Sequence, residues 1–378
     1  MAVSVTSTGL RHVSVLATGA YLPGDPIDNT ALAALCGELP AEVLDEIQVQ
    51  RRHWIIDPAT GAQHHSTSGM AVAAARQALA RAELEPAEVD LLVMSTASPE
   101  YPLPAAVTYV QEKLGLEHCA AIEFRAGCVG AVQGIDYARR LLADGTYRTA
   151  VVIGAESISP LFAPLFVGQD PAALRLRDLL TIYTFGDGAG AQVLRAGAPE
   201  SASPAGEFTF ATQCLGGTRK PGMQIIGGGT DAPAAVQVRR KKLVEMKLDV
   251  SGTQKFGPRV FAAAMTDLLG RSGLTVSDLD ACVVPEGNAE YFAKEFTAAG
   301  VSPQDQAHLG KSMVENLADV GATGSAAVPL ALDAGWTGGR IQPGDTVLLL
   351  AIEASRYLYA GLTLTWEAPT PAGAAHVG

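Results

Sequence analysis

The sequence has no apolar stretch that approaches the roughly 20 residues needed to cross a membrane. Its first residues, MAVSVTSTGLRHVSV, have neither the basic start nor the apolar core of a signal peptide. Cysteine is scarce too, with five in 378 residues and no CxxC spacing. This pattern argues against a disulfide framework or a metal site, and favours reduced thiols in a cytoplasmic protein.

Charged residues are also few, at 17% of the chain, and positive charge is in deficit. The formal net charge of −12 argues against nucleic-acid binding, because phosphates require a basic surface. Hydrophobic residues, in contrast, make up 48% of the chain, which is enough to form the core of two ordinary domains or of one large unit.

A faint internal duplication indicates how the chain is organised. Equivalent residues recur at offsets of 190 or 197 positions: Arg81 and Arg271, Asp90 and Asp280, Thr149 and Thr346, Glu156 and Glu353. Repeats of this length are too large for a solenoid and predict duplicated halves of one enzyme. We expect an N-terminal half at residues 1–197 and a C-terminal half at 207–368, with a Gly/Pro-rich seam at 196–206.

Each half alternates helical stretches with short strands rich in Val, Ile and Leu, such as LLVMSTA and TVLLLAIEA. These strands lack polar alternation, which is typical of sheets that are buried on both faces. The sequence therefore predicts an α/β fold in which helices sandwich and separate the sheets. We expect helices at 68–82, 129–143 and 258–272, an irregular excursion at 216–235, and a disordered tail from Ala368.

Cys128 lies in the segment FRAGCVG, between a β-rich stretch at 120–124 and the helical stretch at 129–143. A thiol at a helix N-terminus is favoured as thiolate by unpaired amides and by the helix dipole. Small neighbours leave the sulfur accessible to an acyl group. On the local sequence alone, a nucleophile and a buried structural cysteine are about equally supported.

The duplication suggests which residues surround Cys128. The strand end at VVPEG corresponds to the strand end at VMSTA, and the helix opening at 321–325 corresponds to the one at Cys128. Strand ends and helix starts from both halves should therefore converge, which is a common place for α/β active sites. Glu286 and Ala322 are the predicted neighbours of Cys128.

Seven segments, in order along the chain, resemble the ketoacyl synthase III family of the thiolase superfamily. They are GAYLP at 19–23, the Arg52-His53 pair, the Cys128 segment, FGDGAGAQVL at 185–194, VPEGN at 284–288, GATGSAAVPLAL at 321–332 and GRIQPGDTVLLL at 339–350. The resemblance implies a homodimer of thiolase-like, five-layered αβαβα subunits. It also implies an acyl group carried on cysteine, delivered through a tunnel by coenzyme A or an acyl carrier protein, with no further cofactor.

The chain departs from the family pattern at the site itself. Glu286 replaces the family's histidine, and Ala322 replaces its asparagine. Gln50 aligns with an arginine that holds coenzyme A in relatives, and the glycine-rich oxyanion loop reads EASRY at 353–357. Substrate-binding positions implied by the resemblance are Gln50, Arg52, Trp54, Phe256 and Ala322.

These replacements change the expected chemistry. Decarboxylative condensation forms an enolate whose oxygen needs neutral donors, whereas an ionised Glu286 only accepts hydrogen bonds and Ala322 has no polar side chain. Losing one such donor commonly costs roughly 3–4 kcal/mol, so losing two disfavours that reaction. A glutamate can instead accept a proton from an incoming nucleophile. We expect Glu286 to act as base, with the backbone amides of Cys128 and near Ser355 holding the oxyanion.

The resulting interpretation is an acyltransferase of the EC 2.3.1 type that serves polyketide or antibiotic assembly. The acceptor would be an alcohol, an amine or a carbon nucleophile, the last including non-decarboxylative condensation such as tetronate formation. Two alternatives stay open: a decarboxylative 3-oxoacyl-ACP synthase with a protonated Glu286, and a non-catalytic partner of an active homologue. The sequence leaves the acyl chain, the acceptor and the pathway unassigned.

Three weaker signals have competing explanations. The basic run at 239–242 is either a solvated surface or a docking site for an acidic carrier protein. Trp54 and Phe256, like Tyr101 and Phe124, either line the acyl tunnel or belong to the ordinary core. Asp187, in a glycine-rich turn at 185–190, is expected to cap or brace that turn.

Overall fold

Two five-stranded sheets form the centre of the computed structural model, which describes residues 10–198, 208–239, 245–285, 287, 293, 296–297 and 301–371. The first sheet contains, in spatial order, β1 (Val13–Tyr21), β7 (Gly188–Ala196), β6 (Thr149–Glu156), β4 (Leu91–Ser95) and β5 (Ala120–Phe124). The second contains β8 (Thr209–Cys214), β14 (Leu358–Thr365), β13 (Thr346–Glu353), β11 (Ala281–Val283) and β12 (Met313–Val314).

The two sheets have the same topology. In each, the strand that comes first in the chain is at one edge and pairs antiparallel with the last strand, which pairs antiparallel with the fourth. The second and third strands then continue the sheet in parallel. Each sheet falls within one of the two halves that the sequence repeat indicates.

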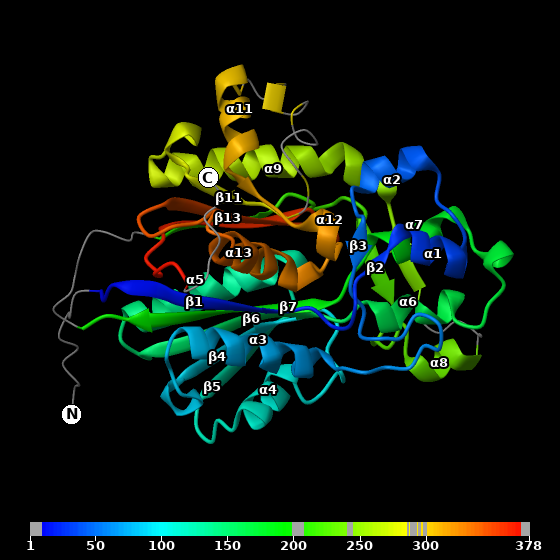
Figure 1. Cartoon of the computed structure of the whole chain (residues 1–378), viewed down its shortest axis with the longest axis horizontal. Helices are drawn as coiled ribbons and strands as arrows, with labels where there is room; N and C mark the ends of the chain where they lie inside the picture. Colours follow the sequence, from blue (N-terminus) through cyan, green and yellow to red (C-terminus); the bar gives the residue numbers. More distant parts are fainter. Residues whose placement is uncertain are drawn as a thin grey trace.

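Helices separate and cover the sheets, giving the five αβαβα layers seen in Figure 1. The outer layer on the first sheet contains α3 (Thr67–Arg81) and α4 (Ala106–Leu114), while α5 (Gly130–Ala143) and α13 (Ala327–Thr337) lie between the sheets. The layer over the second sheet contains α9 (Val250–Ser272) and α11 (Pro303–Ser312). The expected α/β class and thiolase-like layering are confirmed.

Most of the remaining elements lie at one end of the layers, on the right in Figure 1. They are β2 (Ile27–Asp28), α1 (Asn29–Cys36), α2 (Ala41–Ile47), β3 (Arg51–Arg52), α6 (Ser159–Phe166), α7 (Leu176–Thr184), α8 (Ala234–Arg239) and the paired strands β9 (Met223–Ile226) and β10 (Glu245–Leu248). α12 (Leu317–Val320) lies against β3. Short 3₁₀ turns complete the chain at η1 (Pro86–Glu88), η2 (Gly127–Val129), η3 (Pro171–Ala173), η4 (Val276–Asp278) and η5 (Gly324–Ala326).

Three sequence expectations need correction. Helix α9 begins at Val250, with Pro258 in its interior rather than at its start. The stretch expected to be irregular at 216–235 contains β9, which pairs with β10. The tail packs well beyond its expected boundary: Ala368 is buried, and the carbonyl of Pro369 accepts the indole N–H of Trp336 at 3.2 Å. Residues 372–378 lie outside the described part.

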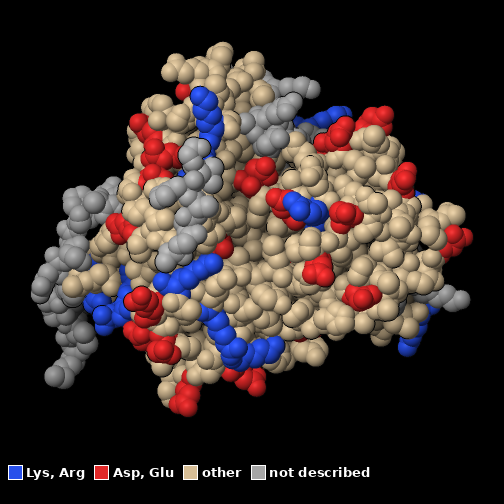
Figure 2. Space-filling model, in the orientation of Figure 1, with Lys and Arg blue, Asp and Glu red and all other residues tan. Residues whose placement is uncertain are grey.

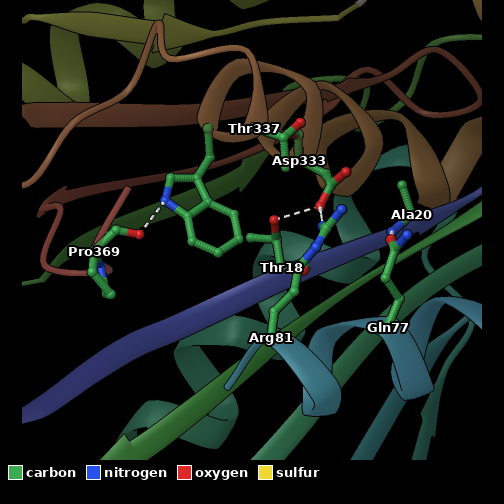
Figure 3. A network of polar contacts seen from close by, with 8 residues as sticks. Thr18, Ala20, Gln77, Arg81, Asp333, Thr337 and Pro369 are labelled. Carbon is green, nitrogen blue, oxygen red and sulfur yellow. Dashed lines mark hydrogen bonds and ion pairs between the residues drawn. The ribbon is translucent and has the colours of Figure 1, made fainter. Parts of the chain in front are cut away.

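An ion pair between the buried carboxylate of Asp333 and the half-buried guanidinium of Arg81 ties the two halves together (Figure 3). Asp333 of α13 accepts hydrogen bonds from Thr18 Oγ1 of β1 and from Arg81 Nη1 at the end of α3, both at 2.6 Å. Arg81 also donates to the carbonyl of Thr18 at 2.9 Å and lies over the ring of Trp336. Since Asp333 belongs to the second half and its partners to the first, this cluster fixes how the halves meet.

Candidate active site

Cys128 lies in the turn η2, which leads directly into α5, and its side chain is half-buried. β5 ends at Phe124, so the cysteine stands between a strand end and a helix start, as the sequence predicts. Amides in the first turn of a helix have no partner within the helix, and the dipole adds partial positive charge there. The amide of Cys128 is therefore suited to bind an anion.

That amide donates to the carboxylate of Glu353 at the end of β13, with an N–Oε2 distance of 2.6 Å. The other carboxylate oxygen, Oε1, accepts from the amide of Ser355 at 2.8 Å. Glu353 is only 3% exposed. The two amides that were expected to hold a substrate oxyanion thus both donate to a side chain of the protein itself in this structure.

A second carboxylate binds the equivalent turn of the other half. Glu156, at the end of β6, accepts the amide of Ser325 in η5 at 3.2 Å. Glu353 follows Glu156 by 197 positions, and Ser325 follows Cys128 by the same 197 positions. Burial raises the pKa of Glu156, whose carboxylate also accepts hydrogen bonds from the segment Thr96–Ser98.

Ser325 also connects the two turns directly. Its hydroxyl donates to the carbonyl of Gly127 at 2.8 Å and lies 3.1 Å from the hydroxyl of Ser95, at the end of β4. Ser95 and Ser325 are both buried. The second half therefore fixes the peptide unit that precedes Cys128.

Position 127 requires glycine because of its backbone conformation and because Glu353 leaves no space for a side chain. Its φ of +55° lies in the left-handed region that side chains rarely adopt. A Cβ atom at this position would lie 1.8 Å from Oε2 of Glu353. The absence of a side chain at 127 thus makes room for the carboxylate.

The loop after β13 is held by the segment that precedes β9. The amide of Gly222 donates to the carbonyl of Ser355 at 3.1 Å, and the amide of Leu215 donates to that of Tyr357 at 2.9 Å. Phe256 packs edge-on against Tyr357 with ring centroids 4.9 Å apart, and Arg219 lies over the Phe256 ring. Phe256 is therefore close to the loop that carries the Ser355 amide.

Trp54 and Ala322 lie together at the first sheet's side of the site. The indole N–H of Trp54 donates to the carbonyl of Phe185 at 3.0 Å, and Phe185 forms an isolated parallel bridge with Ala322. Trp54 is buried and packs against Phe162 and Phe166. These contacts place Trp54 in the hydrophobic core, which is one of its two predicted roles.

The structure gives Arg52 a structural position instead of a substrate-binding one. Its side chain is fully buried, and the guanidinium donates to the carbonyls of Ile27 and Tyr183 and to Asn29 Oδ1 at 2.7–3.0 Å. Burial lowers the pKa of Arg52 to about 10. With its donors directed at the interior, Arg52 is not presented to a substrate at the surface.

Gln50, in contrast, is exposed and lines a partly open cavity of about 370 Å³. The carboxylates of Asp45 and Glu315 line the same cavity. The amide of Gln50 donates to the carbonyl of Ala318 at 2.8 Å. A coenzyme A phosphate in this cavity would face acidic side chains.

Asp187 has the bracing role that its turn predicts. Its carboxylate accepts the amides of Ile55, Ile158 and Ser159 and the hydroxyl of Ser159, at 2.5–2.9 Å. Burial raises the pKa of Asp187 to about 6, although these donors act in the opposite direction. Asp187 thereby joins three segments just before the start of β7.

Two predicted features lie outside the described residues. They are Glu286, the proposed base, and residues 240–242 of the basic run. Within the described part, no cluster of three or more His, Cys, Asp or Glu residues could hold a metal ion. Figure 2 shows acidic residues spread over one face, with lysines and arginines between them.

Comparison with known proteins decides the family. Residues 122–213 match the model of 3-oxoacyl-[acyl-carrier-protein (ACP)] synthase III, and residues 269–366 match the model of its C-terminal domain. A β-ketoacyl-[acyl-carrier-protein] synthase III from Streptomyces coelicolor is 30% identical over 365 residues, covering 96% of this chain and all of the relative. The chain belongs to the ketoacyl synthase III family. Members of this family are acyl-transferring, condensing enzymes.

Solved structures agree with this assignment. AbyA1, described as a tetronic acid condensing enzyme, superposes with a TM-score of 0.76 and 28% identity over 93% of this chain and 99% of its own. The ketoacyl synthase III of Pseudomonas aeruginosa superposes with a TM-score of 0.73 and 25% identity, covering 96% of this chain and all of that enzyme. The priming β-ketosynthase of the R1128 polyketide pathway, at 23% identity and a TM-score of 0.77, shares the fold.

Within this family setting, the residue that sequence reasoning missed is Glu353. The internal repeat could have indicated this residue, because Glu156 and Glu353 are separated by the same 197 positions as Cys128 and Ser325. Burial raises the pKa of Cys36 to about 11 and that of Cys282 to about 12, which favours the neutral form of these two thiols. None of the helices in the described part of this synthase III relative is long and apolar enough to span a membrane.

Proposed function

We propose that this protein loads an acyl group from a carrier thioester onto Cys128 and then transfers it to an acceptor, as a cytoplasmic acyltransferase of natural-product assembly. The observation that carries the proposal is the placement of Cys128 at the start of α5, where its amide and that of Ser355 converge on one anion-binding position. Such a position is suited to the oxyanion of acyl transfer.

The first step exchanges one thioester for another. The sulfur of Cys128 attacks the donor's carbonyl carbon, the bond to the donor sulfur breaks, and the departing thiol takes up the proton that Cys128 gives up. In the second step the acceptor attacks the acyl–Cys128 carbonyl, and Glu286 accepts the acceptor's proton. The bond between the acyl carbon and the sulfur then breaks, and Glu286 passes the proton to the departing sulfur, which regenerates the thiol of Cys128.

The acceptor is an alcohol, an amine or a carbon nucleophile, since each of these loses a proton as it attacks. Glu286 and Ala322 in place of histidine and asparagine disfavour the decarboxylative route, because neither offers a neutral donor to an enolate. The likeness to AbyA1, which is named as a tetronic acid condensing enzyme, supports a carbon acceptor.

The preferred donor is an acyl carrier protein. The cavity beside Gln50, where the family resemblance implies coenzyme A binding, is lined by the carboxylates of Asp45 and Glu315. Negative side chains at this position disfavour the phosphates of coenzyme A. A carrier protein presents only one phosphodiester to the site, so it is less affected by these charges.

A homodimer fits the exposed sheet edge. β5 is the edge strand of the first sheet and, among the described residues, pairs on one side only, with β4. All five of its residues are partly buried. Sedimentation of the wild type should give a dimer, and Ile122→Asp should shift it toward monomer; a wild-type monomer would refute this assembly.

The central experiment compares the wild type with Cys128→Ala and Glu286→Gln, using acyl groups on carrier proteins and on coenzyme A. Intact-protein mass spectrometry should show an acyl adduct on the wild type and on Glu286→Gln, but not on Cys128→Ala. With an acceptor present, Glu286→Gln should retain its adduct while the wild type turns over. Normal turnover by Glu286→Gln would exclude Glu286 as the base.

A decarboxylative 3-oxoacyl-ACP synthase is the second candidate, because the curated relatives are named as β-ketoacyl synthases. Release of carbon dioxide from malonyl carrier protein, dependent on Cys128, would establish that reaction in place of the transfer. If no adduct forms on Cys128 with any donor, the protein is instead a non-catalytic partner of an active homologue.

A further inference from the structure

Glu353 occupies the position where the oxygen of a substrate would be stabilised. Its Oε2 atom lies 2.6 Å from the amide nitrogen of Cys128, and its Oε1 atom 2.8 Å from that of Ser355. Donors that stabilise an oxyanion during acyl transfer lie about 2.7–3.1 Å from the oxygen they bind. Each carboxylate oxygen accepts one of these two donors, so Glu353 brings negative charge to the place where the proposed oxyanion would form.

We infer that Glu353 is a built-in occupant of the oxyanion hole, and that an acyl donor can load Cys128 only when it displaces this carboxylate. This inference rests on the proposed loading of Cys128 and adds a gate to that step. A thioester carbonyl that approaches the sulfur while Glu353 is in place finds both amides engaged and a negative charge beside them. Donors that cannot move Glu353 are then rejected before any bond forms.

The equivalent residue of the other half supports a mobile role for Glu353. Glu156 accepts four hydrogen bonds from the segment Thr96–Ser98 in addition to the amide of Ser325. Among the described residues, the hydrogen bonds of the Glu353 carboxylate come from two amides, one of which belongs to Cys128 itself. Glu353 is therefore less firmly anchored than its structural counterpart.

The surroundings of Glu353 also allow movement. Ala354 and Ser355, which follow it, are only half-buried, and Arg356 is exposed. The missing side chain at Gly127 leaves the space that the carboxylate fills. Displacement of Glu353 would thus free a volume beside the sulfur without disturbing the core of β13.

A role for Glu353 as the general base fits the geometry less well. Both of its oxygens already accept an amide N–H, so a proton from an acceptor would compete with these two hydrogen bonds. A general base that removes the acceptor's proton must also lie on the acceptor's side of the acyl group. Glu353 instead lies on the side of the amides that bind the carbonyl oxygen.

Two reagents that both react with sulfur separate the gate from other effects. Acylation by a thioester passes through an oxyanion, whereas alkylation by iodoacetamide displaces iodide and forms none. We expect Glu353→Gly to increase the rate of Cys128 acylation by an acyl carrier protein at least about tenfold, as expected for recovered oxyanion donors. Alkylation of Cys128 should change by less than about threefold. Glu353→Gln, whose neutral side chain binds the amides less strongly, should lie between.

The measurements use the full chain with Cys128→Ala as the blank, and peptide mass mapping separates Cys128 from the exposed Cys214. Circular dichroism and the thermal midpoint report on folding, and Glu353→Gln provides the test if Glu353→Gly does not fold. Equal changes in acylation and alkylation, or slower acylation in a folded variant, would overturn the gate alone. Alkylation without acylation in every variant would overturn both the gate and the loading of Cys128. If a variant acylates Cys128 at an unchanged rate but no longer transfers the acyl group, that result would bear on the proposed base, Glu286, and would count against the gate.

Discussion

The hydroxyl of Ser325 donates a hydrogen bond to the carbonyl of Gly127 at 2.8 Å, although the two residues come from different halves of the chain. Gly127 immediately precedes the reactive cysteine, so the second half determines the orientation of the peptide unit whose N–H belongs to Cys128. The site is therefore a product of the interface between the halves.

Removal of this contact should affect both stability and the acylation of Cys128. Ser325→Ala leaves the partly buried carbonyl of Gly127 without that donor, at a cost of about 1 kcal/mol in the free energy of unfolding. We also expect severalfold slower acylation of Cys128, since its amide is no longer held in place. Ser95→Ala is the matched control, because Ser95 contacts the hydroxyl of Ser325 but leaves its bond to Gly127 intact. Equal acylation rates for the two variants would contradict this explanation.

Gly127→Ala should be more destabilising than an alanine at an ordinary left-handed glycine. The backbone penalty alone is about 1–2 kcal/mol, and it can be measured with Gly115→Ala, where φ is +74° and nothing lies within 4 Å of the added Cβ. At Gly127 the added Cβ also meets Glu353 Oε2. Denaturant titration should give Gly127→Ala at least twice the cost of Gly115→Ala.

A double variant identifies the source of that excess. In a Glu353→Gly background the overlap disappears, so Gly127→Ala should cost no more than Gly115→Ala. Additive effects of the two substitutions would mean that the carboxylate and the glycine do not compete for the same space.

The strands could be predicted because they are short apolar runs, buried on both faces. β4, β5 and β13 begin at the predicted residues, and the strands of each sheet lie within one of the two repeated segments of the sequence. The start of α9 could not be predicted in this way. A proline usually marks the first turn of a helix, but here packing of α9 against β8 and β14 stabilises a helix that extends beyond Pro258 toward Val250.

The contents of the site were less accessible to sequence reasoning. Cys128 and its helix start follow from local pattern, but Glu353 lies 225 positions away and its contact exists only after the halves pack together. Arg52 stands in a family motif at the edge of the expected binding site, yet its guanidinium is fully buried. Sequence position alone does not reveal on which side of a strand such a residue lies.

The ion pair between the halves should be a major contributor to stability. Asp333→Ala removes a buried acceptor of both Thr18 and Arg81, and we expect a loss of about 3 kcal/mol in the free energy of unfolding. Asp319→Ala is the control, because its pair with Arg51 is exposed on both sides and should contribute less than about 1 kcal/mol. Similar shifts in denaturation midpoint for both variants would be inconsistent with a structural role for the buried pair.

The contribution of Asp187 to stability should fall as the pH rises from about 4 to above 6. Burial raises its pKa to about 6 in the folded protein, above the ordinary value of 3.8. In this window the folded state binds more protons than the unfolded state, so each increase in pH lowers the free energy of unfolding. Asp187→Asn should reduce that slope, measured by denaturant titration at several pH values.

Asp57 provides the opposite case. Hydrogen bonds from the backbone and side chain of Thr60 lower the pKa of Asp57. Its contribution to stability is therefore present at neutral pH and is lost only in acid, below the pKa of the unfolded chain. Asp57→Asn should leave the slope between pH 4 and 6 as in the wild type, and an equal change in both variants would exclude Asp187 as its source.

The turn η2, which carries Cys128, can be compared directly with the turn η5, which carries Ser325, because a buried carboxylate accepts a backbone amide in each. Backbone, neighbouring glycine and bound carboxylate repeat in both, and the side chain that follows differs in one heavy atom, sulfur at position 128 and oxygen at position 325. A perturbation that acts on the shared scaffold should alter both turns alike, while one that acts on the thiol should alter only one. Spectroscopic labels on the amides of Cys128 and Ser325 would therefore show whether a bound acyl donor changes the backbone of both turns or only the turn that carries the thiol.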